Sequence, residues 1–349
     1  MKVAVVTSSP PLAEGGHLVI ARAVVEALRE AGHDAGLMVT PQNRFGRQAS
    51  AYVATWLTDV GIAHDGSRID HVISFRYPSY AVRHPRHVVW LNHRMREYYD
   101  LWDRFQATLS WKARLKERLR RAAIHRVDTY LLTRRVTRVF AQSATIQQRL
   151  RRFGGIPADV LYPPAPPRPY RCDGYGPDLF AVSRFTPLKR IDLLVRALAE
   201  PAAAGVRCTI AGGGEDTARI TGLVRELDLD SRVTLLGAID ADGLVAHLAS
   251  CRAVVFPAFE EDFGLVTVEA FASRKAVITC RDSGGPAELV RDGESGLICD
   301  PTPASLAAAL ARLSADQRLA ERLGAGAASV SRDISWPRTI ERLLLQDAG

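Results

Sequence analysis

Residues 256–290 read FPAFEEDFGLVTVEAFASRKAVITCRDSGGPAELV, and this stretch decides how the chain is interpreted. Two carboxylates, Glu261 and Glu269, stand eight positions apart, the first in a turn with a Phe-Gly pair and the second in the apolar run that follows. This run predicts a helix that begins just after Gly264, and the free amides and dipole of such a helix favour an anion at its N-terminus. Glu269, about one turn into the helix, is expected to accept hydrogen bonds from hydroxyls near that anion. A phosphate beside hydroxyls describes a nucleotide-sugar site.

The length and the composition suit a globular protein of two domains. The chain has 349 residues, too many for one compact core, and 47% of them are hydrophobic. No stretch approaches about 18 consecutive apolar residues, so no membrane-spanning helix is predicted. The N-terminal sequence MKVAVVTSSPP indicates a first β-strand rather than a signal peptide. The five scattered cysteines are typical of reduced thiols, so we expect a cytoplasmic protein, with the inner face of the membrane as an alternative location.

The net charge of +8 is distributed unevenly. Residues 1–170 contain 26 Lys and Arg against 13 Asp and Glu, whereas residues 171–349 contain 20 against 25. A basic half attracts anions, so we expect an anionic acceptor or an anionic surface as its partner.

Strand-like and helix-like stretches alternate in both halves, which indicates parallel sheets. Five prolines between positions 163 and 169 interrupt the alternation and predict an extended linker. We therefore predict a Rossmann-like domain at 1–163, a linker at 164–175, a nucleotide-sugar-binding domain at 176–335, and a C-terminal helix at 336–349 that returns to the first domain. The predicted architecture is α/β, with two doubly wound domains facing a cleft.

The individual elements are predicted from apolar periodicity and from Gly and Pro punctuation. Strands are expected at 2–8, 35–39, 71–75, 87–91, 136–141, 159–162, 179–183, 207–211, 233–236, 253–256 and 276–279. Helices are expected at 18–31, 144–152, 191–200, 218–227, 243–250, 266–272 and 304–313.

Segment 256–290 resembles the Glu-seven-residues-Glu signature of retaining glycosyltransferases of family 4, which have the GT-B fold. The carboxylate pair, the Phe-Gly turn and the trailing Ser283–Glu288 together carry the resemblance, and further motifs match in the expected order along almost the whole chain. The resemblance implies a UDP- or GDP-type sugar donor, a glycan, lipid or small-molecule acceptor, and no metal or other cofactor. It implies that Glu269 binds the ribose and that Glu261 lies near the donor sugar, where it is the one carboxylate that could act as a nucleophile.

The resemblance also supplies a set of candidate site residues. The candidates for donor binding are Gly15, Gly16, Arg184, Lys189, Phe263, Gly264, Leu265, Val266 and Glu269. The candidates for catalysis are Glu261, His93, Arg184 and Lys189.

Arg184 and Lys189 follow the first predicted strand of the second half. Open α/β sheets bind ligands at the carboxyl ends of their strands, and two cations there can hold a diphosphate. The segment resembles the Gly-Arg-(variable)-Lys-Gly loop of the family, although Ser183 and Arg190 stand where glycines are usual. The alternative is a pair of solvated surface cations.

Two weaker signals lie in the first half. The pair Gly15–Gly16 follows the first strand, where glycines let the backbone approach a ligand closely, although a plain turn would look the same. His93 follows a strand end and resembles the histidine that family members hold near the donor sugar. His17 is its rival, and Arg94 and Arg96 are candidates for the acceptor side.

The remaining acidic and glycine-rich motifs are interpreted as structural. The triglycine at 212–214 resembles a family loop and predicts a tight turn near the nucleotide base. The Asp-x-Asp triplets at 228–230 and 240–242 are expected to be solvated turns, so no metal site is predicted. No Cys-His constellation suits zinc.

Residues 111–126 predict a basic helix with an apolar stripe, formed by Trp111, Leu115, Leu119 and Ala122. The cations around the stripe are Lys112, Arg114, Lys116, Arg118, Arg120 and Arg121. Such a helix can lie on an anionic bilayer. Alternatively, the stripe packs on the first domain and the cations are merely solvated.

Two other classes of function stay open. One is another enzyme with this fold, a sugar-nucleotide epimerase or a glycoside phosphorylase, and activity with inorganic phosphate would identify the phosphorylase. The other is a non-enzymatic basic protein that binds nucleic acid or a membrane through residues 104–138. Aromatic residues there are too sparse for base stacking, so no nucleic-acid partner is expected.

Overall fold

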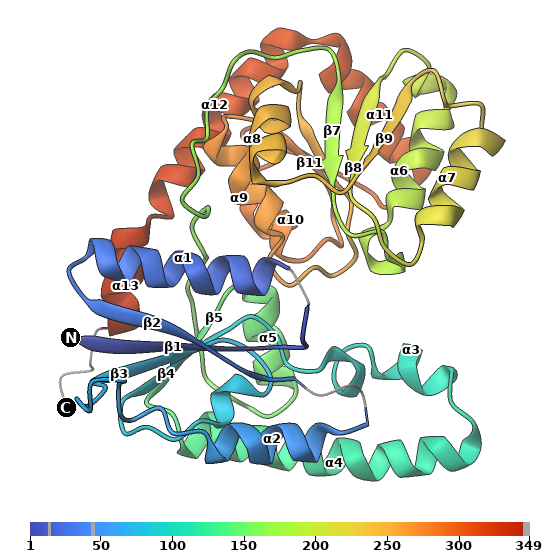
Figure 1. The fold of residues 1–349 in the computed structure, drawn as a ribbon. Helices are drawn as coiled ribbons and strands as arrows, with labels where there is room; N and C mark the ends of the chain where they lie inside the picture. Colours follow the sequence, from blue (N-terminus) through green and yellow to red (C-terminus); the bar gives the residue numbers. More distant parts are fainter. Residues whose placement is uncertain (13–14, 43–45, 345–349) are drawn as a thin grey trace. The chain divides into compact units, whose positions relative to one another are not determined.

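The computed structural model describes residues 1–12, 15–42 and 46–344 (Figure 1). The chain divides into two compact units: the first comprises Met1–Pro163 and the segment from Trp336 onward, and the second comprises Pro164–Ser335. The division falls inside the proline-rich run, where the missing amide donors and the fixed φ angle of proline prevent a strand or helix from continuing.

The first unit is built on a parallel sheet of six strands in the order β2-β1-β3-β4-β5-β6. The strands are β1 (Lys2–Ser9), β2 (Asp34–Pro41), β3 (His71–Ser74), β4 (His87–Leu91), β5 (Arg138–Ala141) and β6 (Asp159–Val160). Every residue of β3 and β4 is buried, which is the pattern of parallel strands with both faces covered.

Helices cover both faces of this sheet. They are α1 (Gly16–Glu30), α2 (Gln48–Leu57), α3 (Trp102–Ala107), α4 (Trp111–Arg134), α5 (Ala144–Arg152) and α13 (Trp336–Leu344), with short 3-10 turns η1 (Ser79–Ala81) and η2 (Arg96–Tyr98). Helix α1 lies on one face, while α2 and α4 lie on the other (Figure 1). Helix α13 packs against α1, and its Trp336 ring meets the buried ring of Trp90 edge-on at 6.4 Å.

The second unit repeats the plan with the strand order β12-β11-β10-β7-β8-β9, again all parallel. Its strands are β7 (Leu179–Val182), β8 (Cys208–Ala211), β9 (Val233–Gly237), β10 (Val254–Phe256), β11 (Val277–Cys280) and β12 (Gly296–Cys299). Its helices are α6 (Ile191–Ala199), α7 (Thr217–Glu226), α8 (Ala241–Ser250), α9 (Leu265–Ala272), α10 (Gly285–Leu289), α11 (Pro303–Ala315) and α12 (Gln317–Asp333), with turns η3 (Pro187–Lys189) and η4 (Pro201–Ala203).

Each sheet has one topological switch point, where successive strands stop being added on one side of the first strand and are added on the other. In the first unit the switch point lies between β1 and β3, and in the second it lies between β7 and β10. The loops that leave the carboxyl ends of two such strands diverge to opposite faces of the sheet, and the crevice between them is where open α/β sheets bind ligands. From the fold, a ligand site is therefore expected at the loops after β1, β7 and β10.

Five helices and strands were not predicted, namely α2, α3, α10, α12 and β12. Helix α12 contains two interior glycines, a residue that lowers helix propensity by about 1 kcal/mol relative to alanine. One of them, Gly324, lies so close to the carbonyl of Arg274 that a Cβ atom there would be 2.2 Å from its oxygen. Close packing of α12 on the turn after α9 thus requires a residue that weakens the local helix signal.

Candidate functional site

The loops after β7 and β10 lie side by side at the carboxyl edge of the second sheet. The amide of Phe259 donates to the carbonyl of Leu188 at 2.7 Å. The Lys189 ammonium donates to the Glu261 carboxylate at 2.5 Å, and both side chains are largely buried. The structure therefore brings together a cation and a carboxylate that the sequence separates by 72 positions.

The backbone around Glu261 is fixed by the segment after β11. The Glu261 amide donates to the carbonyl of Ser283 at 2.9 Å, and the Gly285 amide donates to the carbonyl of Glu261 at 3.0 Å. These paired bonds form a short parallel bridge between Glu261 and Gly284. A residue bonded on both sides of its backbone holds its side chain in one direction, which is what a positioned functional group needs.

Arg190, in the loop after β7, stands at a position where the family resemblance implies glycine. Its backbone is left-handed, with a φ of 50°, a conformation that glycine adopts at little cost and other residues rarely adopt. Its guanidinium makes two hydrogen bonds to the Asp282 carboxylate, at 2.8 and 2.5 Å, and lies over the ring of Phe259. The ion pair offsets the backbone strain and ties the β7 loop to the turn after β11.

Arg184, the other predicted phosphate-binding cation of the β7 loop, lies beside the triglycine turn at 212–214. Arg184 is exposed, and the amide of its neighbour Phe185 donates to the carbonyl of Gly213 at 2.9 Å. The triglycine turn thus packs directly on the β7 loop. Its predicted nearness to a nucleotide base stays a prediction.

Helix α9 begins directly after Gly264, as predicted. Gly264 has a φ of 76°, and a Cβ atom there would lie 2.6 Å from the Pro286 ring. The first amides of α9, at Leu265 and Val266, have no carbonyl within the helix to accept from them, as at any helix N-terminus. Phe263, a predicted donor-binding residue, is only 3% exposed, so it presents little surface to a ligand.

Glu269 lies one turn into α9, where its carboxylate is held by the segment that joins the two units in sequence. Its side chain pairs with Arg168 and accepts a hydrogen bond from the Tyr170 hydroxyl at 3.2 Å. Glu269 is only 4% exposed, and this burial raises its pKa against the lowering effect of Arg168. Sequence reasoning missed Arg168 and Tyr170. The available signal was that Arg168 is the only charged residue in the proline-rich run at 162–170.

In the first unit, the loop after β1 leads into α1 at the predicted glycine pair. Gly15 caps α1 through its carbonyl, which accepts from the Leu18 amide at 3.0 Å. The rival histidine, His17, lies 3.2 Å from the Ser9 hydroxyl at the end of β1.

His93 follows β4 and lines a small cavity beside a group of charged side chains. The cavity is also lined by Arg94, Arg96, Asp100 and Arg149. Arg94 is buried, and its guanidinium donates to the carbonyls of Phe153 and Arg149 at 3.1 and 3.2 Å, so it secures the end of α5. Arg96 and Arg149 both pair with Asp100.

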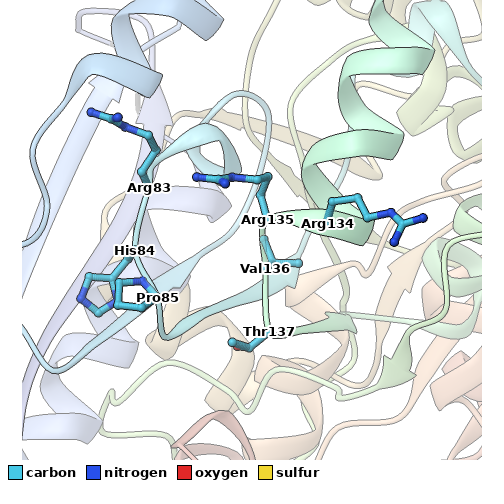
Figure 2. A pocket seen from close by; sticks show the side chains of 7 residues that line it. All are labelled: Arg83, His84, Pro85, Arg134, Arg135, Val136 and Thr137. Atoms are coloured by element: carbon cyan, nitrogen blue, oxygen red, sulfur yellow. The ribbon is translucent and has the colours of Figure 1, made fainter.

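A separate basic hollow of about 520 Å³ lies on the first unit (Figure 2). It is lined by Arg83, His84, Pro85, Arg134, Arg135, Val136 and Thr137. These residues precede β4 and β5, so the hollow is at the amino edge of the sheet, opposite the edge where ligands of such sheets bind. We therefore do not assign the chemistry to it.

The two Asp-x-Asp triplets have local roles. Asp240 caps α8 by accepting from the Gly243 amide at 2.8 Å, and Asp228 occupies a left-handed turn after α7. Among residues 1–12, 15–42 and 46–344, no three His, Cys, Asp or Glu side chains gather in a way that could hold a metal ion. In the same ranges, no helix has both the length and the apolar character needed to cross a bilayer.

Comparison with known proteins places these features in context. Residues 170–330 match the family described as Glycosyl transferases group 1. The chain is 37% identical over 174 residues to the D-inositol 3-phosphate glycosyltransferase of Nocardia farcinica, covering 47% of this chain and 38% of that protein. The corresponding protein of Thermomonospora curvata is 36% identical over 178 residues, or 48% of this chain and 41% of that protein. The match thus spans about two fifths of the length of these relatives.

Solved structures resemble the whole chain. Sucrose-phosphate synthase from Thermosynechococcus elongatus matches with a TM-score of 0.74 and 19% identity, covering 97% of both chains. Anabaena HepE in complex with UDP and glucose matches with a TM-score of 0.70 and 18% identity, covering 97% of this chain and 98% of that one. The two parallel doubly wound sheets and these neighbours confirm the predicted GT-B fold. The family match over the second unit and the fold together support a GT-B glycosyltransferase.

Proposed function

We propose that the chain is a retaining glycosyltransferase that moves a sugar from a nucleoside-diphosphate sugar to an acceptor, without a metal ion or other cofactor. The observation that carries the proposal is the group of side chains on and beside the loops after β7 and β10, which we call the β7/β10 edge. Lys189 and Glu261 pair on neighbouring loops, and Glu269 lies one turn into the helix that begins beside them. A cation and free helix amides suit phosphate, and carboxylates suit sugar hydroxyls.

The diphosphate is proposed to lie against the β7 loop and the N-terminus of α9. When the bond between the anomeric carbon and the diphosphate breaks, negative charge develops on the β-phosphate, and donors fixed in advance stabilise it most. Lys189 is fixed by its ion pair and by the bond between the two loops. Arg184, exposed on the same loop, and the amides at 264–266 would complete the set.

Lys189 and Glu261 match the two groups that are joined by the bond between the anomeric carbon and the diphosphate. The anomeric carbon connects the sugar, which presents hydroxyls, to the diphosphate, which presents negative charge. A carboxylate and an ammonium held next to each other can therefore bind the sugar and the phosphate at once. This arrangement supports a direct role for both residues.

Retention is proposed to follow a front-face route. In that route the bond to the diphosphate breaks, the acceptor oxygen bonds to the anomeric carbon on the same face, and its proton passes to the leaving phosphate oxygen. The alternative uses Glu261 as a nucleophile. The ion pair with Lys189 stabilises the carboxylate and makes it a poorer nucleophile. Mass spectrometry of the protein incubated with donor alone would show a glycosylated Glu261 peptide only under the alternative.

The donor and the acceptor are proposed from chemistry and from the comparisons. The solved Anabaena HepE holds UDP and glucose, so we propose a UDP-type donor, with GDP as the second choice. The matched relatives are named for an inositol phosphate acceptor, and the first half of this chain is strongly basic. We therefore propose an acceptor that carries negative charge, with His93 near the transferred sugar.

A thermal-shift screen against UDP, GDP, TDP and their sugars tests the proposal. A ligand at 100 times its dissociation constant stabilises the folded state by about 2.7 kcal/mol, which is easily measured. We expect one nucleotide series to stabilise the protein without added metal, and its sugar to be transferred in a following assay. No stabilisation by any of them would contradict the proposal.

A further inference from the structure

Helix α4 faces the first unit with its carboxylates. Its only two acidic residues, Glu117 and Asp128, are both buried. Glu117 accepts a hydrogen bond from the Tyr98 hydroxyl at 2.7 Å. Asp128 accepts hydrogen bonds from three tyrosine hydroxyls, those of Tyr52, Tyr80 and Tyr99. These bonds replace the water that a buried carboxylate loses and hold α4 in one orientation.

The opposite face of α4 presents large apolar side chains to solvent. Trp111, Leu115 and Leu119 are 72%, 59% and 69% exposed. Because they are spaced four apart, they form one stripe along the helix. The expectation that this stripe packs on the first domain is therefore wrong for these three side chains. The physical reason is that the carboxylates, with their tyrosine partners, occupy the inward face.

Exposed cations flank the stripe. Lys112 and Lys116 lie on the outer face, as do Arg118 and Arg126. Since both acidic residues of the helix point inward, no carboxylate of α4 offsets these charges on its outer face. Beside the C-terminal half of the helix, Arg126 also lines a hollow of about 780 Å³, to which Arg121, Arg134 and Arg152 add further positive charge.

We propose that the outer face of α4 docks on the surface of a bilayer that contains anionic lipid. The helix has 24 residues and is roughly 36 Å long, so it can lie in the plane of the interface over its whole length. Its Trp and Leu side chains would enter the headgroup boundary while its cations bind lipid phosphates, and this charge complementarity selects an anionic bilayer as the partner. The inference does not depend on the proposed sugar transfer, because it rests on residues outside that site.

Co-sedimentation with vesicles tests the inference without any sugar nucleotide present. The full chain is mixed with phosphatidylcholine vesicles, with or without phosphatidylglycerol, at low and at high salt. We expect pelleting only with the anionic vesicles, and less of it at high salt. A far-UV circular dichroism spectrum and a melting curve of each variant show whether it is folded.

Two α4 variants and two matched controls locate the surface. Trp111→Ser/Leu115→Ser and Lys112→Glu/Lys116→Glu should each lower the partition coefficient by on the order of tenfold or more. The apolar control is Val53→Ser/Leu57→Ser, which changes two exposed apolar residues of α2. The charge control is Arg312→Glu/Arg318→Glu, which makes the same change of charge on exposed residues of the second unit. Both controls should pellet like the wild type.

Three results would overturn the inference. The first is no pelleting on anionic vesicles at low salt. The second is an equal loss in the controls and in the α4 variants. The third is a loss in the charge variant alone, because attraction without insertion of the apolar stripe would be the behaviour of a general polyanion binder.

Discussion

Replacing Arg168 by methionine is expected to destabilise the second unit in a pH-dependent manner. Arg168 pairs with Glu269, and the two side chains are only 19% and 5% exposed. Removing one partner of a buried ion pair costs about 3–5 kcal/mol, because the other charge stays buried without compensation. Tyr170 still donates to the carboxylate and Arg168 is not fully buried, so we expect the low end, about 3 kcal/mol near neutral pH.

The pH dependence follows from the carboxylate. Burial already raises the pKa of Glu269, and loss of the guanidinium raises it further. A carboxyl group whose pKa is higher in the folded state binds its proton more readily when folded. Its penalty is therefore absent below the unfolded pKa of about 4.3, and above that value it grows by up to about 1.4 kcal/mol per pH unit until the folded pKa is reached. The Arg168→Met variant should thus lose much of its penalty near pH 5.

Urea unfolding of the wild type and of Arg168→Met at about pH 7.5 and about pH 5 measures both effects. Arg171→Met is the control, since its pair with Asp173 is half exposed and such pairs contribute about 0–1 kcal/mol. The double variant Arg168→Met/Glu269→Gln should recover part of the stability, because no buried charge is left. A cost below about 1 kcal/mol at both pH values, or one that does not change with pH, would refute the reasoning.

Three further predictions concern the cations, the metal and the buried histidines. Arg184→Ala or Lys189→Ala should lower turnover by roughly 10²–10³, the usual loss for one fixed donor to developing charge, and turnover within about threefold of wild type would remove them from the mechanism. The melting temperature should change little for the exposed Arg184 and should fall for Lys189, whose loss leaves the largely buried Glu261 carboxylate unpaired. Activity should survive excess EDTA, and a loss restored by Mg²⁺ or Mn²⁺ would contradict metal independence. Burial lowers the pKa of His71 to about 4 and of His87 to about 3, so each imidazole stays neutral in the folded chain and charges in the unfolded one. The contribution of these histidines to stability is therefore full above about pH 6.5, and the free energy of unfolding should fall by about 2 kcal/mol per histidine by about pH 5. If urea unfolding of a His87→Asn variant shows the same dependence of that free energy on pH as the wild type, this reasoning is contradicted.

Much of the second unit could be predicted from the sequence because its signals are local. Continuous apolar runs predicted strands, and Gly264 correctly marked the start of α9. Contacts between distant segments could not be predicted this way. Arg168 and Glu269 are 101 positions apart, and no local pattern pairs them. Arg190 looks like a departure from a glycine position, yet the structure gives it the left-handed backbone that the position requires and a carboxylate partner in Asp282.

Helix α4 shows a different limit. An apolar stripe at helical spacing indicates a face of the helix without indicating whether that face points to the core or to solvent. The orientation of the helix is decided by Glu117 and Asp128 on the opposite face, because both carboxylates are buried there. In the sequence alone, two acidic residues on one helix face look like an ordinary solvated face. Their tyrosine partners come from several distant segments, so the sequence alone does not pair them with these carboxylates.

Calorimetric titration of the nucleotide into carboxylate variants tests the central claim most directly. If Glu269 binds the ribose and Glu261 binds the transferred sugar, then Glu269→Ala should weaken the affinity for free UDP, whereas Glu261→Ala should retain that affinity and lose turnover. Glu288→Ala, a carboxylate on the adjacent helix α10, is the control and should bind UDP like the wild type. Unchanged UDP affinity in the Glu269→Ala variant, with weakened affinity in the Glu261→Ala variant, would contradict the assignment of the two carboxylates at the β7/β10 edge.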